Sequence, residues 1–335
     1  MMKFPTKKKK KNHRNIICFC LGAFMVASFQ QMPLMNNIPK QNKAASITTT
    51  PAEEEDTSII IVSNLIPMHP EISMTAAVLD SAFAFLEGLS PTVPVYITID
   101  GLVEPESKYA RKHNYVPNTE PNRVRLQQYI NNLRVHYLDK KNVHILPSVV
   151  WGHINYNIKK ALDVVETKYV YVLQHDEAFI RKVDHKAVVK TFDEFYPEHI
   201  FKLEFPLYKI KDAVWSKGEC LGMKTPVDHV NGINITKVNG WSDQNHFTTK
   251  EYYLKILKDI GPVPRSPEFP MNNQAQKNCT FLGVHNFGTL DGDPYIGHLD
   301  GRFSKEHSKV EEAEAEGGVN LKAEAKADEE AKEMD

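Results

Sequence analysis

The residues best suited to chemistry follow a short apolar run in the middle of the chain. The run YVYVL at 169–173 leads directly into Gln174, His175, Asp176 and Glu177. In an open α/β sheet, ligands bind beyond the carboxyl ends of the strands. Burying a carboxylate there is costly unless it is paired with a cation or bound to a metal. The pattern therefore predicts that Asp176 serves a ligand site, and turn stabilisation is the alternative.

Two more predicted strands, at 58–63 and 93–99, end in polar residues at the same edge of the expected sheet. Asn64 begins the loop after the first strand, and Asp100 and Gly101 follow the second. These strand ends are the next places where ligand contacts are expected. A simple Asp-Gly turn explains Asp100 equally well.

Apolar strands that alternate with helices indicate how these residues are positioned. This alternation predicts an α/β fold with a doubly wound, mostly parallel sheet and helices on both faces. Asp184 is placed to cap one of the helices, and Thr248 and Glu251 have capping-box spacing at another. The predicted strands are 58–63, 93–99, 143–146, 168–173 and 200–205, and the predicted helices are 71–86, 122–137, 154–165, 184–195 and 249–259.

This combination of features resembles the glycosyltransferases of the GT-A fold, in their broad family-2-like group. Those enzymes have a βαβ nucleotide-binding half and then a strand that ends in an Asp-x-Asp motif, which binds a metal ion and through it the donor diphosphate. Here Gln174, His175 and Asp176 take the place of that motif, and Gln174 replaces its first acid. The resemblance covers residues 57–303. It implies Mn²⁺ or Mg²⁺ as a cofactor, with Asp176 as its ligand and Glu177 as a further candidate.

The resemblance also implies roles for residues outside this motif. Asp243 precedes the helix at 249–259, where inverting members place the base that removes a proton from the acceptor hydroxyl. Capping or turn formation is the alternative for Asp243. His285 or His298 would supply a final metal ligand. The predicted donor contacts are Asn64, Asp100, Gln174, His175 and Asp176, and the predicted acceptor contacts are Trp241, which would look the same as a core residue, and Trp215.

The N-terminal residues predict insertion into a membrane. A basic tail at 1–15, with an unbroken lysine run from Lys7 to Lys11, precedes an apolar segment at 16–35 that reads as a signal anchor or a signal peptide. A stem at 36–56 would then join this segment to the catalytic domain. By the positive-inside rule, the domain would face the lumen of the endoplasmic reticulum or Golgi apparatus. The absence of acids in this stem before Pro51 also fits targeting to a complex plastid.

Composition sets further limits. The formal net charge of −1 predicts no nucleic-acid partner, and the tail at 304–335 is of low complexity and rich in Glu, Ala and Lys. Cys220 and Cys279 could pair or remain free, and no Cys/His spacing typical of zinc sites occurs. Glycosylation sequons begin at Asn234 and Asn278, which agrees with a lumenal glycoprotein.

The sequence therefore predicts a glycosyltransferase that moves a sugar from a nucleotide-sugar donor to a glycan, protein or lipid hydroxyl. Direct displacement with inversion is the favoured route, and retention stays open. One alternative is a nucleotidyltransferase, which the glycine-free loop SNLIPMHP at 63–70 disfavours. Another is a catalytically inactive protein that binds carbohydrate or nucleotide sugar, which Gln174 at the first motif position would suit.

Overall fold

The structure is a computed structural model that describes residues 56–65, 71–107, 116–210, 224–261, 266–278 and 282–299. The predicted basic tail, membrane segment and stem up to residue 55 lie outside these ranges, as do Trp215, Cys220, Cys279 and the tail at 304–335. Within the described ranges, no helix combines the length and apolar character needed to cross a membrane.

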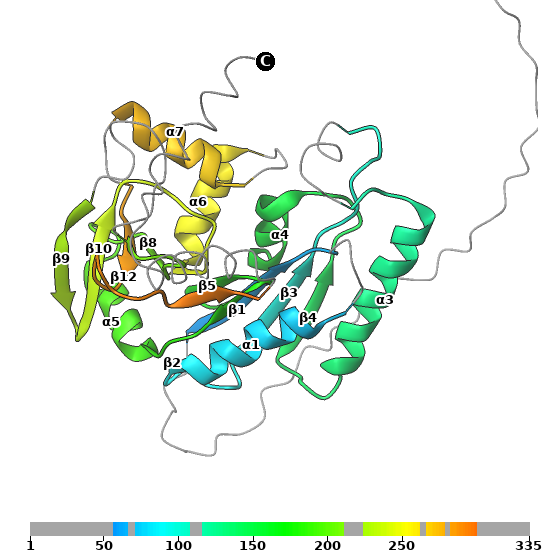
Figure 1. The fold of residues 1–335 in the computed structure, drawn as a ribbon, viewed down its shortest axis with the longest axis horizontal. Helices are drawn as coiled ribbons and strands as arrows, with labels where there is room; N and C mark the ends of the chain where they lie inside the picture. The colour runs from blue at the N-terminus through cyan, green and yellow to red at the C-terminus, as the bar shows by residue number, and fades with distance from the viewer. Residues whose placement is uncertain are drawn as a thin grey trace, which may run out of the picture. The chain divides into compact units, whose positions relative to one another are not determined.

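A nine-stranded sheet forms the centre of the described domain (Figure 1). Four neighbouring strands, β4, β3, β1 and β5, are parallel. On the other side of β5, the sheet continues with the antiparallel β11, then β8 and β12, and finally β10 and β9. The strands are β1 (Thr57–Ser63), β3 (Val95–Ile99), β4 (Val143–Pro147), β5 (Tyr169–Gln174), β8 (Lys202–Glu204), β9 (Lys224–Val230), β10 (Ile233–Val238), β11 (His246–Thr249) and β12 (Val284–Phe287).

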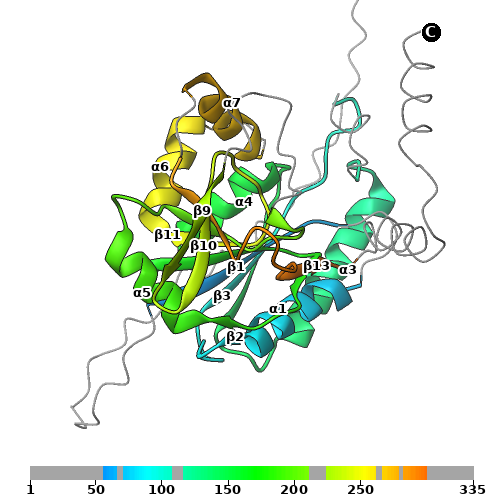
Figure 2. The same ribbon diagram turned by 60° about the vertical axis from the view of Figure 1, so that its left-hand side comes forward.

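Helices cover both faces of this sheet, with α4, α6 and α7 on one side and α1 and α5 on the other (Figures 1 and 2). Every residue of β1 is buried, and its side chains alternate between two cores. A strand covered on both faces reads as a continuous apolar run, which is the pattern of Ile59 to Val62. The helices are α1 (Ser73–Phe85), α3 (Glu120–His136), α4 (His153–Leu162), α5 (His185–Phe195), α6 (Lys250–Ile260) and α7 (Glu268–Asn278).

Two small sheets complete the described structure. β2 (Leu86–Glu87) pairs with β7 (Val183–Asp184), and β13 (Ile296–His298) pairs antiparallel with β6 (Glu177–Phe179). The second pairing brings a late segment of the chain to the residues that follow β5. This observed architecture confirms the predicted α/β fold, with a mostly parallel sheet and helices on both faces.

The predicted helix ends hold at one helix and shift at another. The Asp184 carboxylate accepts the Ala187 amide at 3.0 Å, so it caps α5 as predicted. At α6, the cap is Thr249 rather than Thr248, because Thr249 Oγ1 accepts the Tyr252 amide at 3.1 Å. Thr248 is a buried residue of β11 whose hydroxyl donates to the Phe201 carbonyl at 2.7 Å. Strand pairing on both sides of β11 thus extends the strand past the predicted start of the helix.

Replacing Asp184 by Ala should destabilise the domain by about 1 kcal/mol, because one buried amide at the start of α5 loses its acceptor. Urea unfolding followed by circular dichroism measures this change. Glu198→Ala, an exposed position beyond the end of α5, is the control and should change the unfolding free energy little. Equal unfolding free energies for wild type and Asp184→Ala would show that this cap adds nothing.

Candidate functional site

The end of β5 is fastened to the loop that precedes β11. The Asn245 side chain accepts a hydrogen bond from the Gln174 backbone N–H at 2.7 Å and donates one to the Glu177 backbone carbonyl at 2.8 Å. The Asn245 backbone N–H donates to Glu177 Oε2 at 3.0 Å. Gln174 Nε2 donates to the Asp243 carbonyl at 2.8 Å. A carboxylate at position 174 could not donate this bond, which is a structural reason for glutamine at the first position of the motif.

A cavity of about 440 Å³ opens beside these contacts between β5 and the loop before β11, at the carboxyl edge of the sheet. Acidic side chains come to it from three parts of the chain: Asp176 and Glu177 follow β5, Asp243 precedes β11, and Glu268 begins α7. The lining residues are Gln174, His175, Asp176, Glu177, Leu207, Tyr208, Ser242, Asp243, Gln244, Glu268 and His298. The structure therefore brings Gln174, His175, Asp176, Asp243 and His298 of the sequence prediction together around one cavity.

His298 joins the two carboxylates that follow β5. Its Nδ1 atom lies 3.7 Å from Asp176 Oδ2, and its Nε2 atom lies 3.8 Å from Glu177 Oε1. The pairing of β13 with β6 sets this position, because it places His298 opposite Glu177. The Leu299 amide also donates to the Asp176 carbonyl at 2.9 Å. Imidazole and carboxylate groups from distant parts of the chain thus converge on one wall of the cavity.

His285 lies elsewhere. It sits within β12, opposite Leu203 of β8 and Lys237 of β10, and it does not line the cavity. Burial lowers the pKa of its imidazole to about 4, so the side chain is neutral at physiological pH. Of the two histidines proposed from sequence as a final metal ligand, the structure places only His298 beside Asp176.

The chemistry of the donor set suits a divalent cation. Mg²⁺ is usually bound by one or two protein carboxylates together with substrate phosphates and water, and imidazole also serves Mn²⁺. Asp176, Glu177 and His298 offer such donors. Across the described ranges, however, no three His, Cys, Asp or Glu side chains are arranged as a complete metal site.

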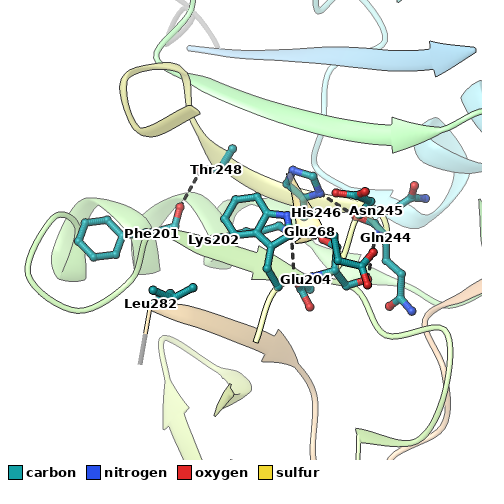
Figure 3. A network of polar contacts seen from close by, with 12 residues as sticks. Phe201, Lys202, Glu204, Gln244, Asn245, His246, Thr248, Glu268 and Leu282 are labelled. Atoms are coloured by element: carbon teal, nitrogen blue, oxygen red, sulfur yellow. Dashed lines mark hydrogen bonds and ion pairs between the residues drawn. The ribbon is translucent and has the colours of Figure 1, made fainter. Parts of the chain in front are cut away.

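A buried ion pair supports the opposite wall (Figure 3). Lys202 and Glu204 point to the same side of β8, their side chains are 0% and 1% exposed, and Lys202 Nζ lies 2.8 Å from Glu204 Oε1. Lys202 donates to the Ser242 carbonyl, and Glu204 accepts the Ser242 amide at 2.9 Å. Both backbone groups of the residue before Asp243 are therefore held by one ion pair.

Helix α7 holds Trp241, the residue before Ser242. The Asn272 side chain accepts the Trp241 amide at 2.7 Å and donates to the Trp241 carbonyl at 2.9 Å. The Trp241 ring itself lies in the core, 1% exposed, with Lys202 Nζ 3.8 Å from the ring centroid. The prediction that Trp241 stacks on an acceptor sugar is therefore corrected, because a buried ring presents no face to a ligand. Trp215 lies outside the described residues.

Burial raises the pKa of the carboxyl groups on this wall. It is the main cause of the raised pKa of Asp243, opposed by the hydrogen bond from Ser266 and by Lys202. Burial and the neighbouring Asp243 raise the pKa of Glu268 to about 7. Burial also disfavours the charged forms of Lys202 and Glu204, since it lowers the pKa of Lys202 and raises that of Glu204. The wall thus holds carboxyl groups that retain protons at unusually high pH.

Asp100 serves the backbone rather than the cavity. Its Oδ1 atom accepts the Gly101 and Gly152 amides at 2.9 Å each, and its Oδ2 atom accepts the His153 amide at 2.9 Å. This carboxylate therefore makes the Asp-Gly turn and caps α4. These bonds support the turn alternative for Asp100, and its contact with the donor stays a prediction. Asn64 lies beside it at a separate cavity of only about 10 Å³.

The sequence prediction missed Glu268, the Lys202–Glu204 pair and the fastening role of Asn245. One local signal for the ion pair existed, because FKLEF places two opposite charges on the same face of an otherwise apolar strand. Glu268 follows a proline-rich stretch with no local sign of a site. Only the packing of α7 against the loop at 241–243 brings it to the cavity.

No protein-family model matches this chain, and no curated protein matches it by sequence. Solved structures with similar folds include residues 1–349 of S. aureus TarS, at 11% identity and a TM-score of 0.38 over 80% of this chain and 67% of that one. The mannosyltransferase PcManGT from Pyrobaculum calidifontis, in complex with GDP-Man and Mn²⁺, is 7% identical at a TM-score of 0.38, over 68% of this chain and 56% of that one. GalNAc-T7 with UDP, GalNAc and Mn²⁺ is 9% identical at a TM-score of 0.41, over 72% of this chain and 42% of that one.

Lys202→Met should destabilise the domain by about 3–5 kcal/mol, because it leaves Glu204 buried without its cation. Urea unfolding measures the loss. The double variant Lys202→Met/Glu204→Leu removes both charges and should recover part of the stability. Unfolding free energies that match wild type in the single variant would contradict a structural role for the pair.

Proposed function

We propose that this protein is a glycosyltransferase that moves a sugar from a nucleotide-sugar donor to a hydroxyl group of a glycan, protein or lipid. One observation carries the proposal. Asp176, Glu177 and His298 on one side, and Asp243 and Glu268 on another, meet around a single cavity at the carboxyl edge of the sheet. Such a cavity has separate groups for holding a diphosphate through a cation and for accepting a proton.

Asp176 would hold the cation, with His298 and Glu177 beside it. A Mn²⁺ or Mg²⁺ ion bound there would neutralise charge on the leaving diphosphate. Gln174 would act indirectly, since its side chain donates a hydrogen bond to the Asp243 backbone carbonyl and so fixes the loop before β11. His175 lines the same cavity and would contact the donor.

The opposite wall would face the acceptor. A carboxylate there would remove the proton of the acceptor hydroxyl as its oxygen attacks the anomeric carbon, and the carbon–oxygen bond to the diphosphate would break. Attack from the face opposite to the leaving group inverts the configuration. The sequence assigned the role of base to Asp243, and the cavity contains Glu268 as a second carboxyl group on the same wall.

Membrane anchoring belongs to the same proposal. The basic tail at 1–15 and the apolar segment at 16–35 support a protein held in the endoplasmic reticulum or Golgi membrane with its domain in the lumen. Targeting to a complex plastid is the alternative. Fusing a glycosylation reporter to the C-terminus and testing its modification would distinguish a lumenal domain from a cytosolic one.

Asp176→Asn should abolish metal-dependent donor binding, because the neutral amide is a much weaker ligand for a hard cation than the carboxylate. Calorimetric titration of the full chain with UDP- and GDP-sugars, with and without Mn²⁺, measures the loss. Asp259→Asn, at an exposed position of α6, is the matched control and should bind like wild type.

Equal metal-dependent binding by wild type and Asp176→Asn would refute the role given to Asp176. A parallel screen for donor hydrolysis and transfer tests the activity itself. Donor binding without hydrolysis or transfer would instead identify an inactive nucleotide-sugar-binding protein.

A further inference from the structure

Asp243 and Glu268 lie on the same wall but present their carboxyl groups differently. Asp243 Oδ1 is buried. Asp243 Oδ2 accepts the hydroxyl of Ser266. A general base needs an oxygen within hydrogen-bond reach of the proton it removes. With Oδ1 buried and Oδ2 bonded to Ser266, Asp243 offers less of its carboxylate to a ligand in the cavity.

Glu268 is better placed for this contact. It is a half-buried residue at the start of α7 and lines the cavity. The start of a helix also favours a negative charge at this position. Its amide donates to Ser266 Oγ at 2.9 Å, and the Ser266 hydroxyl donates to Asp243. Ser266 thus fixes the two acids relative to each other.

We propose that Glu268 is the proton acceptor of the transfer reaction, and that Asp243 is a positioning residue that acts through Ser266 and through its charge. This inference rests on the proposed glycosyl transfer and deepens it. The acceptor proton passes to a Glu268 carboxylate oxygen, and the acceptor oxygen forms the bond to the anomeric carbon. The bond between that carbon and the diphosphate oxygen breaks, and its electron pair leaves with the diphosphate. Glu268 then returns its proton to water.

The surrounding charges tune Glu268 for this task. Burial raises its pKa most, Asp243 and Glu204 raise it further, and Lys202 and a hydrogen bond from the Asp243 backbone lower it, so that the value is about 7. Across the cavity, Asp176 and Glu177 follow β5, and His175 and His298 also line the space. A base works best when its pKa lies near the working pH. Because the ionised form is the active one, transfer should rise as the pH increases through about 7.

The decisive experiment compares two amide variants of the full chain. E268Q should lower kcat by about 10²–10⁴-fold, because an amide accepts no proton, while Mn²⁺-dependent donor binding stays at the wild-type level. D243N should lower kcat far less than E268Q does, and the acid limb of its kcat/KM profile should move to lower pH, because a negative neighbour of Glu268 has been removed. Glu251→Gln changes a glutamate in the first turn of α6 and is the matched control, with wild-type kcat and pH profile.

A second readout needs no turnover. Carboxyl ¹³C NMR titration, with the Glu268 signal assigned from its absence in E268Q, should show a pKa of about 7 in wild type and a lower value in D243N. Transfer that survives in E268Q but is lost in D243N would overturn the assignment and restore Asp243 as the base. A wild-type protein without transfer to any acceptor would overturn the proposed function and this assignment together. A Glu268 carboxyl that titrates near the ordinary glutamate value would overturn the assignment alone.

Discussion

The ion pair between Lys202 and Glu204 is the interaction on which the site depends most. Both charges are sealed inside the sheet, where each would be costly alone, and together they bind both backbone groups of Ser242. The residue after Ser242 is Asp243, and the residue before it, Trp241, is held by Asn272 of α7. One buried pair therefore fixes the loop that α7 and its Glu268 pack against.

The antiparallel strand β11 makes this arrangement possible. It lies between β5 and β8 and runs antiparallel to both, so β11 and the loop before it begin beside the ends of those two strands. Asn245 uses that proximity to join the loop to Gln174 and Glu177. The acids after β5 and the acids near α7 consequently meet at one edge of the sheet. A cavity with so many carboxyl groups attracts cations, and burial raises the pKa of two of them, Asp243 and Glu268.

Prediction from sequence succeeded where structure is local. The strands at 58–63 and 168–173 are continuous apolar runs, and both appear as central strands of the sheet with nearly these bounds. The Asp184 cap was also predictable, because capping depends on neighbours within one helical turn. After Pro206 the pattern predicted one helix, at 249–259, and no further strand. The strand β12 gains its stability from β8 and β10, which are distant in sequence, and no periodicity over a short window reports such pairings.

The sequence by itself determined that Asp176 stands at the carboxyl end of a buried strand, because a single apolar run and its end are properties of adjacent residues. It left His285 and His298 equivalent, and it offered Trp241 as either a surface or a core residue. Only the tertiary structure separated these alternatives, since β13 carries His298 to Asp176 while β12 keeps His285 inside the sheet. The meeting of Glu268 and Asp243 at one cavity was likewise decided by packing between distant segments, which no single stretch of sequence contains.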